Sequence, residues 1–136
     1  MLEKSILLQR TPDEAFRLFT ARISDWWPQS HRPAKDPASV LFLEPNRFLE
    51  RASDGREIPL GRVLSWEPPH RIALDFFIGT GPTQPTSVEI TFTPEADGTR
   101  VLVCHQSKPE SEALWSLRAP TFEKSWETVL AAFLNR

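Results

Sequence analysis

Residues 61–74 read GRVLSWEPPHRIAL, two strand-like runs separated by the double proline Pro68-Pro69. Proline has no N–H to donate to a sheet and is confined to strand ends, edges and turns, so the pair marks a connection between strands. After it, Ile72, Leu74 and Phe76 share one face. This period of two is typical of a strand with one buried side. The stretch therefore predicts an antiparallel hairpin.

Short strands continue on both sides of this hairpin. We expect them over residues 2–9, 40–43, 47–51 and 99–106, and around the alternating Val88, Ile90 and Phe92. Asp54-Gly55 and Asp97-Gly98 are dipeptides that favour tight turns between strands. The pattern predicts an antiparallel meander.

A helix is expected to begin at Pro12, because Thr11 and Glu14 have the spacing of a capping box. Its apolar stripe runs on through Trp26 and Trp27, and one bent helix or two short ones fit this stripe equally. Residues 28–39 hold three prolines and no apolar period, which predicts an exposed, stiff loop that acts as a lid or a rim.

The last part of the chain predicts one strongly amphipathic helix. Its apolar residues recur at helical spacing: Phe122, Trp126, Val129, Leu130 and Phe133. We place Pro120 in its first turn, with Ser111–Leu117 as a separate helical piece; a kinked continuous helix is the alternative. This helix needs an apolar surface to cover its stripe.

The composition fits one domain over residues 1–136, with 40% hydrophobic and 25% charged residues. A formal net charge of -2 gives no attraction to nucleic acid or to anionic membranes. No apolar run approaches the roughly 20 residues that span a bilayer. Cys104 is the single cysteine and no secretory leader opens the sequence, so we expect a cytoplasmic protein.

Several segments, taken in order, resemble one known family. They are residues 23–28 (ISDWWP), 42–45 (FLEP), 61–69 (GRVLSWEPP), 92–94 (FTP), 97–101 (DGTRV) and 126–130 (WETVL), together with Asp54-Gly55 and His105. Their order is similar to that of the START-like, or SRPBCC, superfamily, in the branch of homologues of the activator of the ninety-kilodalton heat-shock protein ATPase. The chain departs from it at Asn46-Arg47, where many relatives carry a glycine pair.

The resemblance implies an α+β helix-grip fold. In this fold a curved antiparallel β-sheet wraps around a long C-terminal α-helix, and two short helices follow the first strand. Chaperone activation is not implied, because one fold hosts many functions.

We predict that the protein binds a small apolar molecule, without a cofactor, in a cavity between the sheet and the final helix. His105 would be the polar anchor, although a purely structural histidine is the interpretation we favour for it. The expected lining residues are Ile72, Leu74, Phe76, Val88, Ile90, Val103, His105, Trp126, Val129, Leu130 and Phe133.

The sequence offers little catalytic chemistry. Cys104 and His105 are adjacent on a strand, so their side chains point to opposite faces and cannot form a nucleophile pair. We expect Glu50, Glu67 and Asp75 at the surface, solvated or in salt bridges. No spacing of histidine, cysteine or carboxylates predicts a metal site. We therefore expect neither catalysis nor a metal.

Two other functions stay open. A protein-interaction module, such as a homodimer or a chaperone regulator, would use exposed aromatic residues near Trp26, Trp27 and Trp115. An enzyme would need His105 and an inward carboxylate as acid and base, and we rank it lowest. Otherwise the tryptophans are expected in the core, with Trp126 as the one that forms a cavity wall.

Overall fold

The computed structural model describes residues 1–136, and its elements follow the predicted order. The strands are β1 (Leu2–Leu8), β2 (Val40–Glu44), β3 (Arg47–Arg51), β4 (Glu57–Glu67), β5 (Arg71–Phe76), β6 (Thr86–Glu95) and β7 (Gly98–Gln106). The helices are α1 (Pro12–Thr20), α2 (Ile23–Trp26) and α3 (Glu112–Leu134), with short 3₁₀ turns at Gln29–His31 and Pro109–Ser111.

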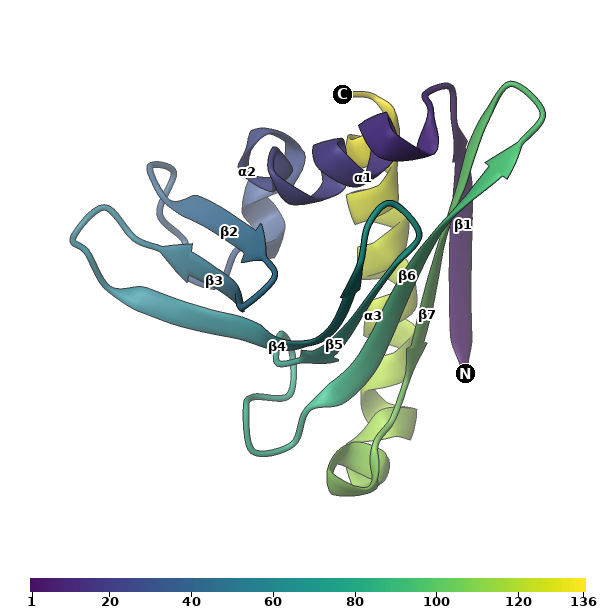
Figure 1. Ribbon diagram of the computed structural model, residues 1–136. Coiled ribbons are helices and arrows are strands. Elements are labelled where there is room, and N and C mark those ends of the chain that lie inside the picture. The colour runs from purple at the N-terminus through teal and green to yellow at the C-terminus, as the bar shows by residue number, and fades with distance from the viewer.

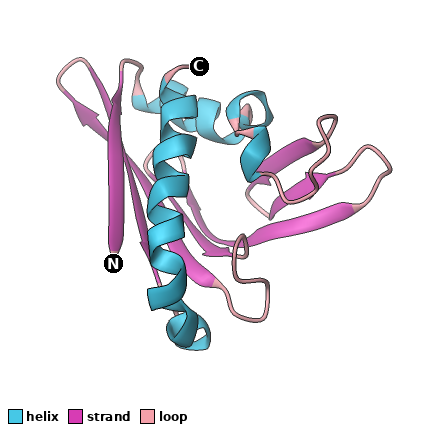
Figure 2. Cartoon of the chain, turned by 180° about the vertical axis from the view of Figure 1, so that it is seen from behind, coloured by secondary structure: helices cyan, strands magenta, loops and turns pink.

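All strands belong to one antiparallel sheet in the order β1-β7-β6-β5-β4-β3-β2. The sheet is strongly curved, and α3 runs along its hollow side (Figures 1 and 2). Near one end of α3, α1 packs against β6 and β7, and α2 packs against β2. The predicted α+β helix-grip fold is confirmed.

The hairpin predicted from Pro68-Pro69 is the β4–β5 pair, and the peptide bond between the two prolines is cis. The pairing register shifts between Val63 and Ser65, and a second shift lies between Phe48 and Leu49 on β3. Such β-bulges bend a strand and increase its twist. They accompany the turn of β4, β3 and β2 away from β1 and β7 (Figure 1).

The capping box at the start of α1 is present as predicted. The Thr11 hydroxyl accepts a hydrogen bond from the Glu14 N–H at 3.2 Å, and the Glu14 carboxylate accepts one from the Thr11 N–H at 3.2 Å. The chain then breaks between Thr20 and Ile23, so the version with two short helices is the correct one.

Thr11→Ala is expected to lower the free energy of unfolding by about 1 kcal/mol, because both reciprocal bonds of the cap are weakened. Urea denaturation measures this loss. Thr128→Ala is the control: it removes an exposed hydroxyl from the middle of α3 and is expected to leave stability unchanged or slightly higher, since alanine favours a helix. Equal losses in both variants would contradict the role of the cap.

The prediction that Pro120 lies in the first turn of the last helix is wrong, because α3 continues unbroken from Glu112 through Pro120 to Leu134. Proline removes one helical hydrogen bond and leaves the carbonyl of Ser116 without its partner. Both residues are exposed, so water can bond this carbonyl. The separate helical piece predicted over Ser111–Leu117 therefore does not form, and the alternative of one continuous helix is the one that the structure has.

The core is one cluster of 25 buried apolar residues between the sheet and the helices. Phe19 lies at its centre, where its ring contacts Trp26, Phe92 and Phe133. Trp26 and Trp27 are buried, 6% and 4% exposed, and Trp115 is half-buried against the core. The prediction of exposed aromatics around Trp26 and Trp27 is therefore wrong. The prediction of core tryptophans is right for Trp26, Trp27 and Trp126, while Trp66 and Trp115 are partly buried against the core. None of the helices is long and apolar enough to cross a membrane.

Candidate functional site

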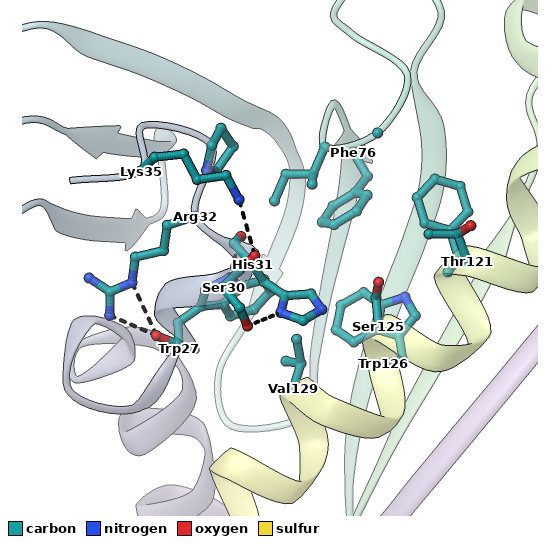
Figure 3. Close-up of a pocket in the computed structure, with 14 residues that line it drawn as sticks. Trp27, Ser30, His31, Arg32, Lys35, Phe76, Thr121, Ser125, Trp126 and Val129 are labelled. Atoms are coloured by element: carbon teal, nitrogen blue, oxygen red, sulfur yellow. Dashed lines mark hydrogen bonds between the residues drawn. The ribbon is translucent and has the colours of Figure 1, made fainter. Parts of the chain in front are cut away.

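A pocket of about 290 Å³ opens between α3 and the loop that follows α2 (Figure 3). The residues that follow β5 form its third side. It is lined by Trp27, Ser30, His31, Arg32, Pro33, Lys35, Phe76, Ile78, Gly79, Thr121, Phe122, Ser125, Trp126 and Val129. We call this hollow the main pocket.

Aromatic rings form the inner wall of the main pocket. Phe76 comes from the end of β5, and Phe122 and Trp126 come from successive turns of α3. Their rings are neighbours, with centroids 5.7 Å apart for Phe76 and Trp126. Gly79 has φ +91°, and a Cβ there would lie 2.9 Å from the Phe122 ring. A glycine at this point thus permits the loop after β5 to close on α3.

The outer side of the main pocket is polar. The Ser30 hydroxyl lies 2.8 Å from His31 Nδ1, and Lys35 Nζ donates a hydrogen bond to the Ser30 carbonyl at 3.3 Å. Figure 3 shows the His31 ring directed toward Ser125 and Val129 of α3. Partial burial, and then the charge of Lys35, lower the pKa of His31 below its usual value. His31 is therefore neutral at neutral pH and able to donate or accept a hydrogen bond.

Arg32 holds the loop that follows α2 in place through its buried side chain. The residue is 3% exposed, and its guanidinium donates hydrogen bonds to the carbonyls of Trp27, Ser39 and Ser24. Burial lowers the pKa of Arg32, and the charge of Glu50 opposes this shift. An arginine that is tied to three carbonyls has a structural role: it fixes the rim that carries His31.

Glu50 is the second buried residue that holds the loop over residues 28–39 in place. It is fully buried and accepts hydrogen bonds from the Ala34 N–H at 2.9 Å and the Ser39 hydroxyl at 2.6 Å. The prediction of a surface position for Glu50 is therefore wrong. On β3 the alternation puts Phe48 and Glu50 on the same inward face, and the loop supplies the partners that a buried carboxylate requires.

The other two carboxylates differ from each other. Glu67 is exposed and pairs with Arg71, as expected. Asp75 pairs with Arg62 at 3.2 Å and with Lys108, so the predicted salt bridge is right. Its side chain is nonetheless 5% exposed, and the surface position is wrong. Arg62 is the cross-strand partner of Asp75 on β4, and Lys108 reaches the same carboxylate from the segment that follows β7.

His105 lies on the buried face with Val101 and Val103 and is fully buried. The Trp126 indole N–H donates to its Nδ1 at 2.9 Å, and Thr86 Oγ1 lies 2.7 Å from its Nε2. Because an indole only donates, Nδ1 must be unprotonated and Nε2 carries the hydrogen that is donated to Thr86. Burial lowers the pKa of His105 to about 3. The ring is thus a neutral link between β7, β6 and α3.

Cys104 lies on the opposite face of β7 from His105, as the alternation predicts. Its sulfur is 3.5 Å from a carboxylate oxygen of Glu3, and burial raises the pKa of the thiol. A thiol with a raised pKa is a poor nucleophile at neutral pH.

The structure brings three of the predicted lining residues to the main pocket, namely Phe76, Trp126 and Val129. The remaining predicted residues lie in the packed interior beside it: Ile72, Leu74, Val88, Ile90, Val103, His105, Leu130 and Phe133. The sequence reasoning missed Ser30, His31, Lys35, Thr121 and Ser125. One signal was available for the last two, since Thr121 and Ser125 are small polar residues four apart on the side of α3 next to Trp126.

Solved structures with the same fold cover almost all of this chain. A protein from Rhodobacter sphaeroides has a TM-score of 0.70 at 22% identity, covering 98% of this chain and 89% of that one. A protein from Mesorhizobium loti has 0.66 at 15%, covering 98% and 93%. DynU16, a protein in the dynemicin biosynthetic locus, has 0.64 at 17%, and the match covers 98% of this chain but 45% of DynU16.

At these identities the structural likeness shows the fold alone. No curated protein matches the chain as a sequence relative. The family model described as "Activator of Hsp90 ATPase homolog 1-like protein" matches residues 9–135, nearly the whole chain. This match confirms the resemblance read from the sequence motifs, and the chain belongs to the Hsp90 ATPase activator homologue 1-like family.

Proposed function

We propose that this protein binds a small, largely apolar molecule in the main pocket and acts as a non-enzymatic binding protein of the cytoplasm. The observation that carries the proposal is the pocket itself, a hollow walled by Phe76, Phe122 and Trp126 with a few polar groups at its outer side. Concave sites of this kind, apolar with a few placed polar groups, are typical of small-molecule binding.

The size of the pocket limits the ligand. A volume of about 290 Å³ is at the lower end of the roughly 300–1,000 Å³ that ligand pockets span. A molecule of one or two rings fits such a space, and stacking against Trp126 and Phe76 supports an aromatic or flat aliphatic body.

We propose that Phe76, Trp126 and Val129 contact the ligand directly. The remaining residues of the predicted cavity support these three from behind, His105 among them through its hydrogen bond with Trp126. His105 therefore orients one pocket wall, and His31 takes the place of the polar anchor.

Titration with N-phenylnaphthylamine, an uncharged dye that fluoresces in apolar surroundings, tests this proposal. Ser125→Trp places an indole in the main pocket and is expected to weaken dye binding by roughly tenfold or more. Leu117→Trp is the matched control, because Leu117 is 69% exposed on the same helix and lies outside the pocket. Equal affinity of the dye for both variants would overturn the proposal.

Native mass spectrometry of the protein purified from its own host identifies the natural ligand, because a retained molecule adds its mass to the protein. The same preparation tests the second candidate function, a protein-interaction module that is a chaperone regulator or a homodimer; the description of the family model favours the chaperone regulator. Light scattering and the ATPase rate of the host's heat-shock chaperone measure it. A monomer that leaves this rate unchanged would remove the second candidate.

A further inference from the structure

The main pocket continues into a second hollow along α3. This hollow is about 230 Å³ and is lined by His31, Pro120, Thr121, Lys124, Ser125 and Thr128. Three of its residues, His31, Thr121 and Ser125, also line the main pocket. The two hollows therefore form one groove, which is apolar at the Trp126 end and polar at the end marked by His31. We call the second hollow the polar end.

The charges along this groove are all positive. Its charged residues are Arg32 and Lys35 in the main pocket and Lys124 in the polar end, beside the titratable His31. The positive charge of Arg32 is offset by the buried Glu50 and bound to carbonyls, so it is not free for a ligand.

Lys35 and Lys124, the lysines of the groove, differ from the other two lysines of the chain in having no carboxylate partner. Lys4 pairs with Glu127 at 2.7 Å, and Lys108 pairs with Asp75. Lys35 and Lys124 have no carboxylate oxygen within 4.0 Å, and the Lys35 ammonium contacts only the Ser30 carbonyl. The two lysines whose ammonium groups have no carboxylate partner thus border the same groove.

The acidic residues near this groove are engaged elsewhere. On α3, Glu127 faces Lys4 of β1, and Glu123 borders a separate hollow beside Met1 and Trp115. On β3, Glu50 is bound to Ala34 and Ser39 beneath the loop. The charges that face His31 are therefore those of Lys35 on its own loop and Lys124 on α3, and an anion there meets no repulsion from a neighbouring carboxylate.

We propose, on the basis of the proposed function, that the natural ligand is an amphipathic anion. Its apolar body lies in the main pocket between Phe76 and Trp126. Its carboxylate, sulfonate or phosphate group lies where the two hollows meet at His31, with Lys35 on the side of the main pocket and Lys124 on the side of the polar end. Hydrogen bonds between charged groups are shorter and stronger than neutral ones, so this end fixes the orientation of the ligand in the groove.

Two dyes with nearly the same ring system test this inference. Anilinonaphthalene sulfonate carries an anionic group, and N-phenylnaphthylamine lacks it. Lys35→Met and Lys124→Met are each expected to weaken the sulfonate dye by roughly threefold to tenfold, with the neutral dye changed less than about twofold. Arg118→Gln, which removes an exposed cation on α3 outside the groove, is expected to change neither affinity.

The outcomes separate the two proposals. One outcome is that Ser125→Trp abolishes binding of the neutral dye while neither lysine variant changes the affinity for the sulfonate dye. This result overturns the proposal of an anionic ligand and leaves the proposal of an apolar pocket intact. Equal weakening of both dyes by the lysine variants also overturns it, because that result indicates a damaged pocket. If neither dye binds the wild-type protein, the proposed function fails and this inference fails with it.

The pH dependence gives an independent measure. An anion beside His31 favours its protonated form, so the sulfonate dye is expected to bind more tightly as the pH falls from about 8 to about 5.5. The neutral dye is expected to show no such rise. His31→Asn should abolish this rise in affinity at low pH, while the effect of the charges of Lys35 and Lys124 remains. If the rise persists in this variant, His31 is not part of the anion site.

Discussion

The free energy of unfolding is expected to fall steeply as the pH drops below about 6.5, with a slope that approaches 1.4 kcal/mol per pH unit from His105 alone. Burial lowers the pKa of His105 in the folded protein to about 3. The unfolded chain binds a proton near the ordinary value of about 6.5, so between these two values it holds more protons than the native state. Stability is therefore lost as the pH falls, on the order of 5 kcal/mol if the whole range were reached.

The physical reason lies in the hydrogen bonds of His105. A second proton on the ring would sit on Nδ1, which already accepts the Trp126 N–H, so protonation would turn that contact into two opposed donors. The ring has no carboxylate partner to compensate for a buried charge, and the contacts from Thr86 and Trp126 are neutral. The native state thus excludes the proton.

Urea denaturation between about pH 6.5 and pH 5 isolates this effect from most carboxylates, which titrate at lower pH. His105→Gln is expected to be less stable at neutral pH but to lose much of the slope. His31→Asn is the control for the other histidine whose pKa burial lowers. Equal slopes in the wild type and in His105→Gln would contradict the assignment.

The sheet and the positions of the helical segments followed from the sequence because their signals are local. An alternation such as that from Ile72 to Phe76, a cap such as Thr11 with Glu14, and a stripe from Phe122 to Phe133 each reflect a periodicity that the backbone imposes. The break between α1 and α2 and the continuity of α3 through Pro120 depended on tertiary packing. Neither could be decided from the pattern alone.

The cavity predicted from the sequence and the main pocket share one wall of α3 and otherwise lie at different places in the fold. Periodicity identifies which residues face inward, and it found Phe76, Trp126 and Val129. It does not show where a cavity remains, because the cavity depends on the position of the loop over residues 28–39, which has no hydrophobic periodicity. The position of residues 28–39 is set by Arg32 and Glu50. The hydrogen bonds of Glu50 join residues 11 and 16 apart, and those of Arg32 go to backbone carbonyls. These contacts have no signature in the sequence.

Arg32→Met is expected to lower the free energy of unfolding by about 3 kcal/mol, because each buried acceptor that loses its donor costs about 1–3 kcal/mol. The variant leaves the carbonyls of Trp27, Ser39 and Ser24 without their side-chain donor, and it leaves the Glu50 carboxylate buried without a nearby cation. A methionine of similar length keeps much of the packing, so the loss reports on hydrogen bonds and charge rather than on a cavity.

Thermal and urea denaturation measure this loss, with Arg118→Met as the control at an exposed position of α3, expected to stay within about 0.5 kcal/mol of the wild type. The double variant Arg32→Met with Glu50→Gln is expected to be more stable than the sum of the two single changes predicts, because it removes the unpaired charge. Since the same loop carries His31 and Lys35, the sulfonate dye should lose affinity in Arg32→Met even where the protein is fully folded. A variant that keeps both wild-type stability and dye affinity would show that the rim of the pocket is held by something other than the hydrogen bonds of Arg32.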